Sequence, residues 1–333
     1  MSKPHPHAAR RPIVAASRGL LACLLAVGAL AAHALDLQGH RGIRGLAPEN
    51  TLPSFELAIA HGVTTLELDA AITKDGVVVI HHDLDMNPDH TRDAAGRWLE
   101  KSSAPIHSLT FAELQGFDVG RLKPGTRYAA QFPEQKPLDG TRVPRLSDLF
   151  DLVKAKGHDK IRFAVELKVT PLWPEATQAP EPFATAVVAE IRKAGMAPRV
   201  QIMSFDWRTL AVVQRIAPEI PTVYLTAQQS WIDNIGAGKP GPSPWTGAVQ
   251  HADHGSVPKM IKAAGGRFWS VYHGDLTADR LKEAQSLGLK VLVWTVTDPA
   301  AMGRFVDMGV DGLITDRADL AMKVLAGKGI RPE

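Results

Sequence analysis

The sequence predicts an α/β protein, a (β/α)8 barrel of the TIM type with an extra antiparallel hairpin strand and an insertion before the third barrel strand. Apolar, β-branched segments of strand length recur along the chain, and several are separated by helix-like segments at 51–61, 183–194 and 277–287. Strands that alternate with helices are typical of parallel βα units. The strand-like segments are 35–40, 64–70, 77–82, 161–167, 199–204, 220–225, 267–272, 290–295 and 310–315.

The segment 77–82 explains why the chain has one strand more than an eight-stranded barrel needs. Only residues 73–76 separate Ile72, at the end of the preceding strand, from Val77. A parallel pair needs a crossover of about a dozen residues or more. The segment must therefore return antiparallel to its neighbour.

This hairpin decides which side chains share a face. We expect a two-residue or four-residue turn at the Asp-Gly signal of residues 75–76. Such a turn places His82 opposite Glu67 or Asp69 and directs His81 to the other face. A three-residue turn would reverse that assignment, whereas the two carboxylates share a face in any register.

The remaining long connections are expected to surround the active site. Residues 84–158 are rich in polar residues, proline and glycine, and they predict an insertion with some structure of its own around 108–120. Two further loops, 170–182 and 226–256, follow predicted strands. They should lie on the C-terminal face of the barrel, where the active sites of such barrels are found.

Residues 1–34 predict a secretory signal peptide, which leaves 35–333 as the barrel. Basic residues precede an apolar segment at 19–32, and Ala32-His33-Ala34 fits an A-x-A cleavage site. A lipobox-like LLAC segment and an Arg-Arg pair are weaker alternatives. No later segment approaches the roughly 20 apolar residues that span a bilayer. We expect a chain without an integral membrane segment, secreted across the inner membrane into the periplasm.

Charge and cysteine content exclude several classes of protein. Four of the 38 basic residues and none of the 35 acidic residues belong to the signal segment, so the remaining chain is close to neutral. This gives no electrostatic case for binding to nucleic acid or to an anionic membrane. The only cysteine, Cys23, also lies in the signal segment, so no disulfide is expected in the barrel.

Five polar residues stand at the ends of apolar segments: His40, Glu67, Asp69, His82 and Glu166. Each should emerge at the same end of the barrel. Three carboxylates that converge there would repel one another unless a cation neutralised them, and an all-oxygen set suits one Ca²⁺ or Mg²⁺. Zinc would recruit histidine or cysteine more readily. Solvated carboxylates on an edge strand are the weaker interpretation, because buried carboxylates without partners are costly.

The segment 40–83 closely resembles the glycerophosphodiester phosphodiesterase family, which belongs to a superfamily of phospholipase C-like phosphodiesterase TIM barrels. It combines an HRG…PENT start, an E-x-D pair, a KDG turn and a His-Asp end. The resemblance continues through SLTFAELQGFDVG, VPRLSDLF, AVELK, MSFD, VLVWTV and DGLITD. It implies a barrel that uses a divalent cation to hydrolyse glycerophosphodiesters, small-molecule substrates, to glycerol 3-phosphate and an alcohol.

The resemblance also implies roles for individual residues. One segment departs from the family: residues 84–93 read LDMNPDHTRD where the family usually has x-x-L-x-R-T-T. This leaves open which alcohol is accepted. Carried over by position, the metal carboxylates are Glu67, Asp69 and Glu166, the catalytic histidines are His40 and His82, and the positive residues beside the phosphate are Arg41 and Lys168.

Hydrolysis of a phosphodiester requires charge neutralisation, an activated nucleophile and protonation of the departing alkoxide. Arg41 and Lys168 would serve the first need, although Lys168 could instead form a structural ion pair with Glu166. Histidines suit the other two needs, since their ordinary pKa is close to neutrality. Which histidine is the base stays open, as does attack by water against attack by a glycerol hydroxyl.

Weaker candidates lie nearby in the sequence. Glu49 and Asn50 could bind ligand or cap the following helix, and Trp294 could stack on the substrate or belong to the core. His251 and His254 have helical ligand spacing, but their Pro/Gly-rich loop argues against a second metal.

Two other functions compete with the hydrolase. One is a phospholipase D-like lyase acting on intact or lyso lipids, and the other is a binding protein that uses the barrel without catalysis. The oligomeric state stays open.

Overall fold

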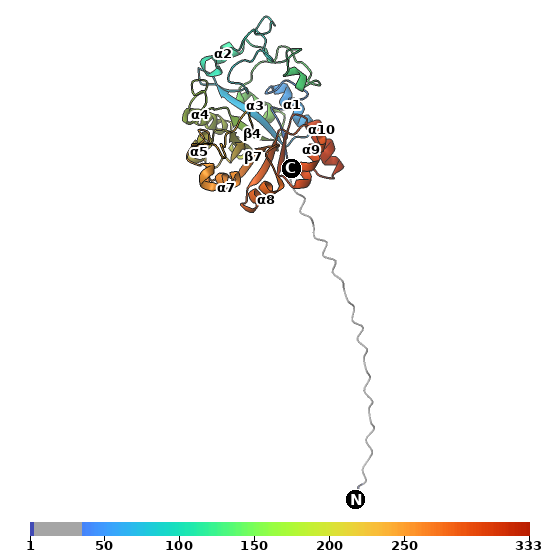
Figure 1. The fold of residues 1–333 in the computed structure, drawn as a ribbon. Coiled ribbons are helices and arrows are strands. Elements are labelled where there is room, and N and C mark those ends of the chain that lie inside the picture. Colours follow the sequence, from blue (N-terminus) through green and yellow to red (C-terminus); the bar gives the residue numbers. More distant parts are fainter. Residues whose placement is uncertain (3–34) are drawn as a thin grey trace. The chain divides into compact units, whose positions relative to one another are not determined.

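Eight parallel strands form a closed barrel in the computed structural model, which describes residues 1–2 and 35–333 (Figure 1). The barrel closes because β1 pairs with β9 on one side and with β2 on the other. Most of the predicted signal peptide lies outside the described residues. The barrel strands are β1 (Asp36–Gly39), β2 (Thr65–Ile72), β4 (Arg162–Leu167), β5 (Val200–Ser204), β6 (Thr222–Thr226), β7 (Phe268–Tyr272), β8 (Lys290–Trp294) and β9 (Gly312–Thr315).

A helix follows each barrel strand, apart from the insertion described below, and covers the outside of the barrel. These helices pack their apolar faces against the outward side chains of the strands in one continuous core. The predicted fold class, with its extra strand, is confirmed. The covering helices are α1 (Leu52–Ala60), α3 (Leu146–Ala155), α4 (Pro180–Lys193), α5 (Trp207–Ile216), α7 (Val257–Ala263), α8 (Ala278–Ser286), α9 (Pro299–Met308) and α10 (Ala318–Gly327).

The interior of the barrel is filled with apolar side chains. Ala164 lies two residues before Glu166 on β4, so both point inward. Ala164 packs with Met203, Val223 and other buried residues of the barrel strands in a separate cluster. This packing closes the barrel beneath the inward carboxylates, and a ligand can reach them only from the C-terminal end.

The hairpin between β2 and β3 (Val78–Ile80) corrects one of our predictions. Ala70 pairs with Ile80, and the N–H of Thr73 donates to the carbonyl of Val77, so the turn has three residues. The expected two-residue or four-residue turn is wrong. Gly76, the third residue of the turn, has φ of 79°. This left-handed residue is typical of three-residue hairpin loops.

The three-residue turn places His81, rather than His82, opposite Asp69. The N–H of His81 donates to the carbonyl of Asp69, but the N–H of Asp69 donates to the side chain of Asn50 instead of back to His81. Regular pairing ends at Ile80. The alternation of faces therefore does not extend to His82, and its direction is set by contacts after the strand.

The insertion has a small core of its own. Met86, Leu114 and Val143 pack with Ala71 and Val79 of the hairpin, away from the main core. Its regular elements are short: η1 (Ile106–Ser108), α2 (Phe111–Leu114) and η2 (Ala129–Gln131). The expected range 84–158 also contains α3, which packs in the main core as a barrel helix. The insertion, cyan to green at the top of Figure 1, thus covers residues 84–145.

Candidate active site

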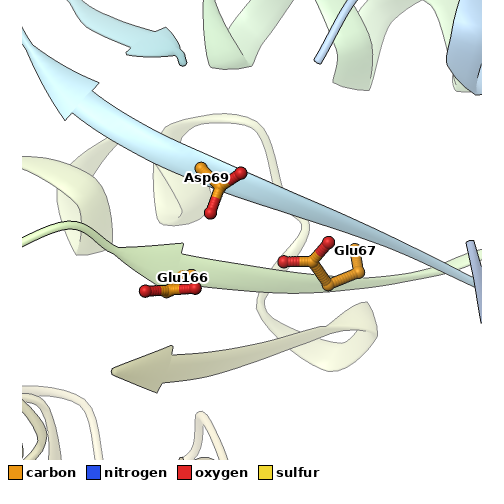
Figure 2. A group of neighbouring side chains, drawn as sticks. All are labelled: Glu67, Asp69 and Glu166. Atoms are coloured by element: carbon orange, nitrogen blue, oxygen red, sulfur yellow. The ribbon is translucent and has the colours of Figure 1, made fainter. Parts of the chain in front are cut away.

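Three carboxylates meet where β2 and β4 leave the barrel. Glu67 and Asp69 come from β2 and Glu166 from β4, and the strand register places Asp69 beside Glu166 (Figure 2). One oxygen atom from each lies within 4.8 Å of the others, and all three side chains are buried. We call these residues the carboxylate triad.

Donors from neighbouring segments contact the carboxylate triad. The backbone N–H of Arg41 donates to Glu67 at 2.8 Å, and the Asn50 amide donates to Asp69 at 2.8 Å. The Lys168 ammonium lies 2.8 Å from Glu166 Oε1 and 3.6 Å from Asp69 Oδ1. Arg41 Nε lies 3.3 Å from Asp69 Oδ2. Asp69 is thus the best compensated of the three.

The pKa values reflect this uneven compensation. Burial and the charges of Asp69 and Glu166 raise the pKa of Glu67 well above its usual range. Burial likewise raises the pKa of Glu166 to about 7, although Lys168 opposes the shift. Two of the three carboxylates are therefore short of positive charge.

The buried charges around the triad do not balance. Counting Glu49 and Asp316 with the triad, five carboxylates face three cationic side chains, those of Arg41, Arg44 and Lys168. When all five carboxylates are ionised, the excess of two negative charges and the all-oxygen donor set fit a divalent cation. The triad is therefore a possible metal site.

His40 is held by a carboxylate that the sequence analysis missed. Its Nδ1–H donates to Asp316 Oδ1 at 2.6 Å, and Arg44 binds both oxygens of Asp316 at 3.0 and 3.1 Å. Nε2 of His40 lies 4.0 Å from Glu67 Oε2. Burial opposes ionisation of Asp316, but Arg44 and His40 hold its pKa well below the usual range. Asp316 therefore fixes the ring of His40 with a charged acceptor.

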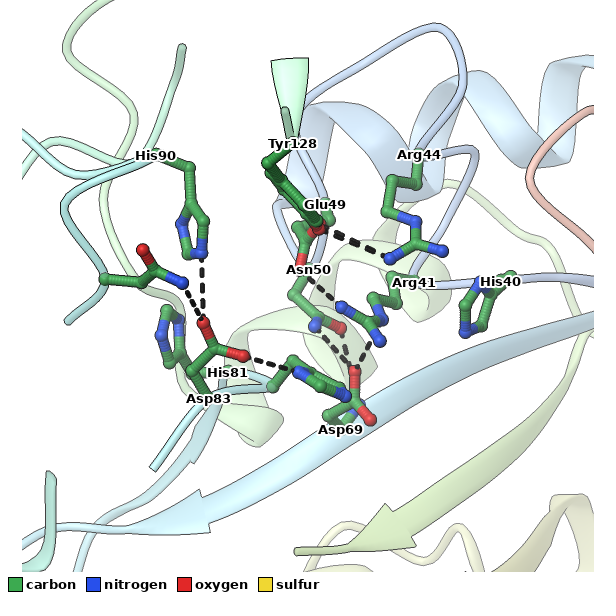
Figure 3. Close-up of polar contacts among 12 residues, drawn as sticks. His40, Arg41, Arg44, Glu49, Asn50, Asp69, His81, Asp83, His90 and Tyr128 are labelled. Atoms are coloured by element: carbon green, nitrogen blue, oxygen red, sulfur yellow. Dashed lines mark hydrogen bonds and ion pairs between the residues drawn. The ribbon is translucent and has the colours of Figure 1, made fainter. Parts of the chain in front are cut away.

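His82 is held in the same way. Its Nδ1–H donates to Asp83 Oδ1 at 2.7 Å, while the amide of Asn87 donates to Asp83 Oδ2 at 2.8 Å. His90 of the insertion lies 3.2 Å from the same oxygen of Asp83 (Figure 3). Burial and the charges of Arg41 and Lys168 lower the pKa of His82 to about 4.

His81 takes no part in the cavity that contains His82. Its ring lies 3.3 Å from the carbonyl oxygen of Asp85 and faces the insertion. The structure thus places His82, and not His81, at the cavity, as we expected. The turn that we predicted as the reason for this placement is nevertheless wrong.

Glu49 positions Arg41. Glu49 Oε1 accepts from Arg41 Nη1 at 2.7 Å, and the hydroxyl of Tyr128, from the insertion, donates to Glu49 Oε2. Arg41 and Arg44 lower the pKa of Glu49 to about 2 against the effect of burial. Helix α1 is capped by Thr51, so Glu49 and Asn50 do not serve as its cap.

A cavity of about 420 Å³ opens over these residues at the C-terminal end of the barrel. Asp69, Glu49 and Asn50 do not line it, but each of them contacts Arg41, which does. His251 and His254, on the short helix α6 (His251–His254), do not line it. The predicted site residues that line the cavity are His40, Arg41, Glu67, His82, Glu166, Lys168 and Trp294.

Comparison with known families agrees with this geometry. A model of the glycerophosphoryl diester phosphodiesterase family matches residues 40–320. The chain belongs to this family. The predicted resemblance and the predicted glycerophosphodiester phosphodiesterase activity are confirmed.

Similar proteins span most of the chain. A glycerophosphodiester phosphodiesterase of Bacillus subtilis is 26% identical over 324 residues, which cover 95% of this chain and 92% of the relative. A crystal structure from Silicibacter pomeroyi, assigned to the same family, is 36% identical with a TM-score of 0.80, over 90% of this chain and 95% of that one.

A phosphodiesterase of Oleispira antarctica, solved with the product sn-glycerol-3-phosphate, shares the fold. It has a TM-score of 0.64 and 19% identity, over 88% of this chain and 97% of that one.

Among the described residues, no helix is long and apolar enough to cross a membrane.

Replacing Asp316 by Asn should lower kcat roughly tenfold or more, because the amide removes the charge that orients His40 and stabilises its protonated ring. KM should change less. Steady-state kinetics on glycerophosphocholine measure the effect. Asp319→Asn is the matched control, since Asp319 pairs with Arg317 outside the cavity. An unchanged kcat in Asp316→Asn would show that this carboxylate does not act through His40.

Proposed function

We propose that the protein is an exported, cation-dependent phosphodiesterase that cleaves glycerophosphodiesters to glycerol 3-phosphate and an alcohol by acid–base catalysis. One observation carries the proposal: two histidines, each bound through Nδ1 to a carboxylate, line one cavity together with Glu67 and Glu166 of the carboxylate triad. The product bound by the Oleispira phosphodiesterase supports the choice of substrate.

The carboxylate triad would hold one cation, Ca²⁺ or Mg²⁺. When bound, the cation supplies charge neutralisation and polarisation of the phosphate. Arg41 and Lys168 line the same cavity and would contact the phosphate oxygens. Both side chains contact the carboxylate triad, so they would lie close to a phosphate bound beside the cation.

His40 and His82 would move the protons. A hydrogen bond from Nδ1–H to a carboxylate keeps that proton in place and leaves Nε2 to face the cavity. One histidine would accept the proton of the nucleophile at Nε2, and the other would donate a proton from Nε2 to the departing alkoxide. Asp316 and Asp83 would stabilise the charged form of each ring in turn.

Export is proposed from the sequence of residues 1–34. The prediction is that expression of the full chain with its native start yields a mature protein beginning at Leu35 in the periplasmic fraction. N-terminal sequencing and cell fractionation measure this. Ala32→Asp should block cleavage, because the A-x-A rule requires a small residue there. A full-length protein confined to the cytoplasm would contradict export.

Removal of divalent cations should abolish turnover, because the triad would then be short of positive charge. Chelation followed by addition of Ca²⁺ or Mg²⁺ should restore glycerol 3-phosphate release and raise the Tm of the wild type. The Tm rise should be lost in Glu67→Gln, and it should persist in Glu113→Gln, a carboxylate on the exposed side of the insertion. Full activity after chelation would contradict the proposal.

His40→Ala and His82→Ala should each lower kcat by about 10²-fold to 10⁴-fold, the range of general acid–base catalysis. His251→Ala, outside the cavity, should leave kcat unchanged. Circular dichroism checks the fold of each variant. Retained activity in both variants would rule out these roles.

Mass spectrometry of the products distinguishes hydrolysis from a lyase reaction, which would accumulate a cyclic phosphate. Binding of the diester without turnover would indicate the non-catalytic alternative.

A further inference from the structure

The side of the cavity opposite the charged residues is aromatic. Phe205, Trp231 and Trp294 line it, and Tyr272 packs behind them. The Trp294 ring contacts Phe205, Tyr272 and Trp231 edge to face, with centroid distances of 5.4, 5.4 and 6.2 Å. We call these four residues the aromatic wall. It continues from the end of β8 to the loop 226–256.

The aromatic wall ends in a rim of exposed apolar side chains. Leu172, Trp173 and Trp231 are 53%, 56% and 59% exposed, and they belong to the loops 170–182 and 226–256. Among the described residues, the other exposed large apolar side chains are Met1 and Leu138, and Leu138 is only 39% exposed. Large apolar groups gathered at a cavity mouth indicate a binding surface.

A second hollow continues the cavity beyond this rim. It has a volume of about 530 Å³ and shares Trp173, Trp231 and Trp245 with the active-site cavity. Prolines and Leu172 form part of its lining. A largely apolar surface therefore runs from beside Arg41 and Lys168 to the rim, and the second hollow beyond it also contains polar residues, among them Asp233 and Lys239.

The chemistry of this surface selects among possible ligand groups. The acidic residues that line the active-site cavity belong to the carboxylate triad, and Asp233, which lines the second hollow, is already paired with Lys239 at 2.8 Å. An ammonium group could stack on these rings, but it would not use the apolar side chain of Leu172 at the rim. A flexible hydrocarbon chain gains from such a surface by burial alone.

We propose that the aromatic wall and the rim bind the acyl chain of a single-chain glycerophospholipid. The inference rests on the proposed function and extends its substrate class. Water would add a hydroxyl group to phosphorus while the bond from phosphorus to the head-group oxygen breaks. The departing alkoxide takes a proton, and the products are the acylated glycerol phosphate and the free alcohol.

The test compares glycerophosphocholine with acyl glycerophosphocholines of increasing chain length, each below its critical micelle concentration. Choline release is measured with the cation-loaded enzyme. Because each buried methylene group contributes a favourable transfer free energy, kcat/KM should rise about twofold to fourfold per methylene until the chain leaves the apolar surface.

Trp173→Ala and Trp231→Ala should flatten this dependence on chain length, because they remove the rim. Both side chains are exposed, so their loss should not unfold the protein. Leu172→Ala should have a smaller effect of the same kind. Its matched control is Leu138→Ala, an exposed leucine of the insertion outside both hollows, and Trp98→Ala controls for the loss of an indole.

Each other outcome has a distinct meaning. If glycerophosphocholine is hydrolysed but chain length has no effect, the inference fails and the proposed function stands. If no diester is hydrolysed, the proposed function fails. If the tryptophan variants lose a preference for choline over ethanolamine diesters without any chain-length effect, the wall binds the ammonium group and the inference is overturned. An equal loss on all diesters would also overturn it.

Discussion

The convergence of three buried carboxylates at one end of the barrel is the constraint on which the rest of the site depends. Buried carboxylates are costly without partners, and here the strand pairing forces Asp69 and Glu166 side by side. Arg41 and Lys168 supply positive charge, and backbone and amide N–H groups supply hydrogen bonds. These partners hold the site together while leaving the negative charge that a cation needs.

The same need for charged partners explains the arrangement of the histidines. His40 is held by a carboxylate that follows β9, the neighbour of β1 in the barrel, whereas His82 is held by the residue next to it in sequence. The insertion completes the contacts around His82 and Arg41. Its residue His90 contacts Asp83, and Tyr128 donates to Glu49. The insertion thus fixes the partners of His82 and Arg41 as well as covering the barrel.

The sequence predicts the barrel well because buried parallel strands produce short, β-branched apolar segments, and because catalytic polar residues follow those segments. The same rule would also have found Asp316, which directly follows the last such segment. Turn length is harder to predict, because the glycine at position 76 is compatible with turns of different length and here forms the left-handed end of a three-residue turn. His82 reaches the cavity only because strand pairing stops at Ile80. Tyr128 belongs to a segment without periodicity and reaches the site through a contact 79 residues away in sequence.

The two sides of the cavity differ in how firmly they are held. On the charged side, Arg41 and Asn50 have left-handed backbone with φ of 51° and 56°, which costs about 1–2 kcal/mol for a residue with a side chain. Glycine would relieve this strain but would lose the guanidinium and amide contacts to Asp69. The strain persists because the N–H of Asn50 donates to the carbonyl of Arg41 and the N–H of Arg41 donates to Glu67. On the apolar side, the rim belongs to long loops that contribute nothing to the triad. In the proposed function, reaction chemistry and substrate choice thus rest on different parts of the chain, and loop residues can change without disturbing the carboxylate triad and the two histidines.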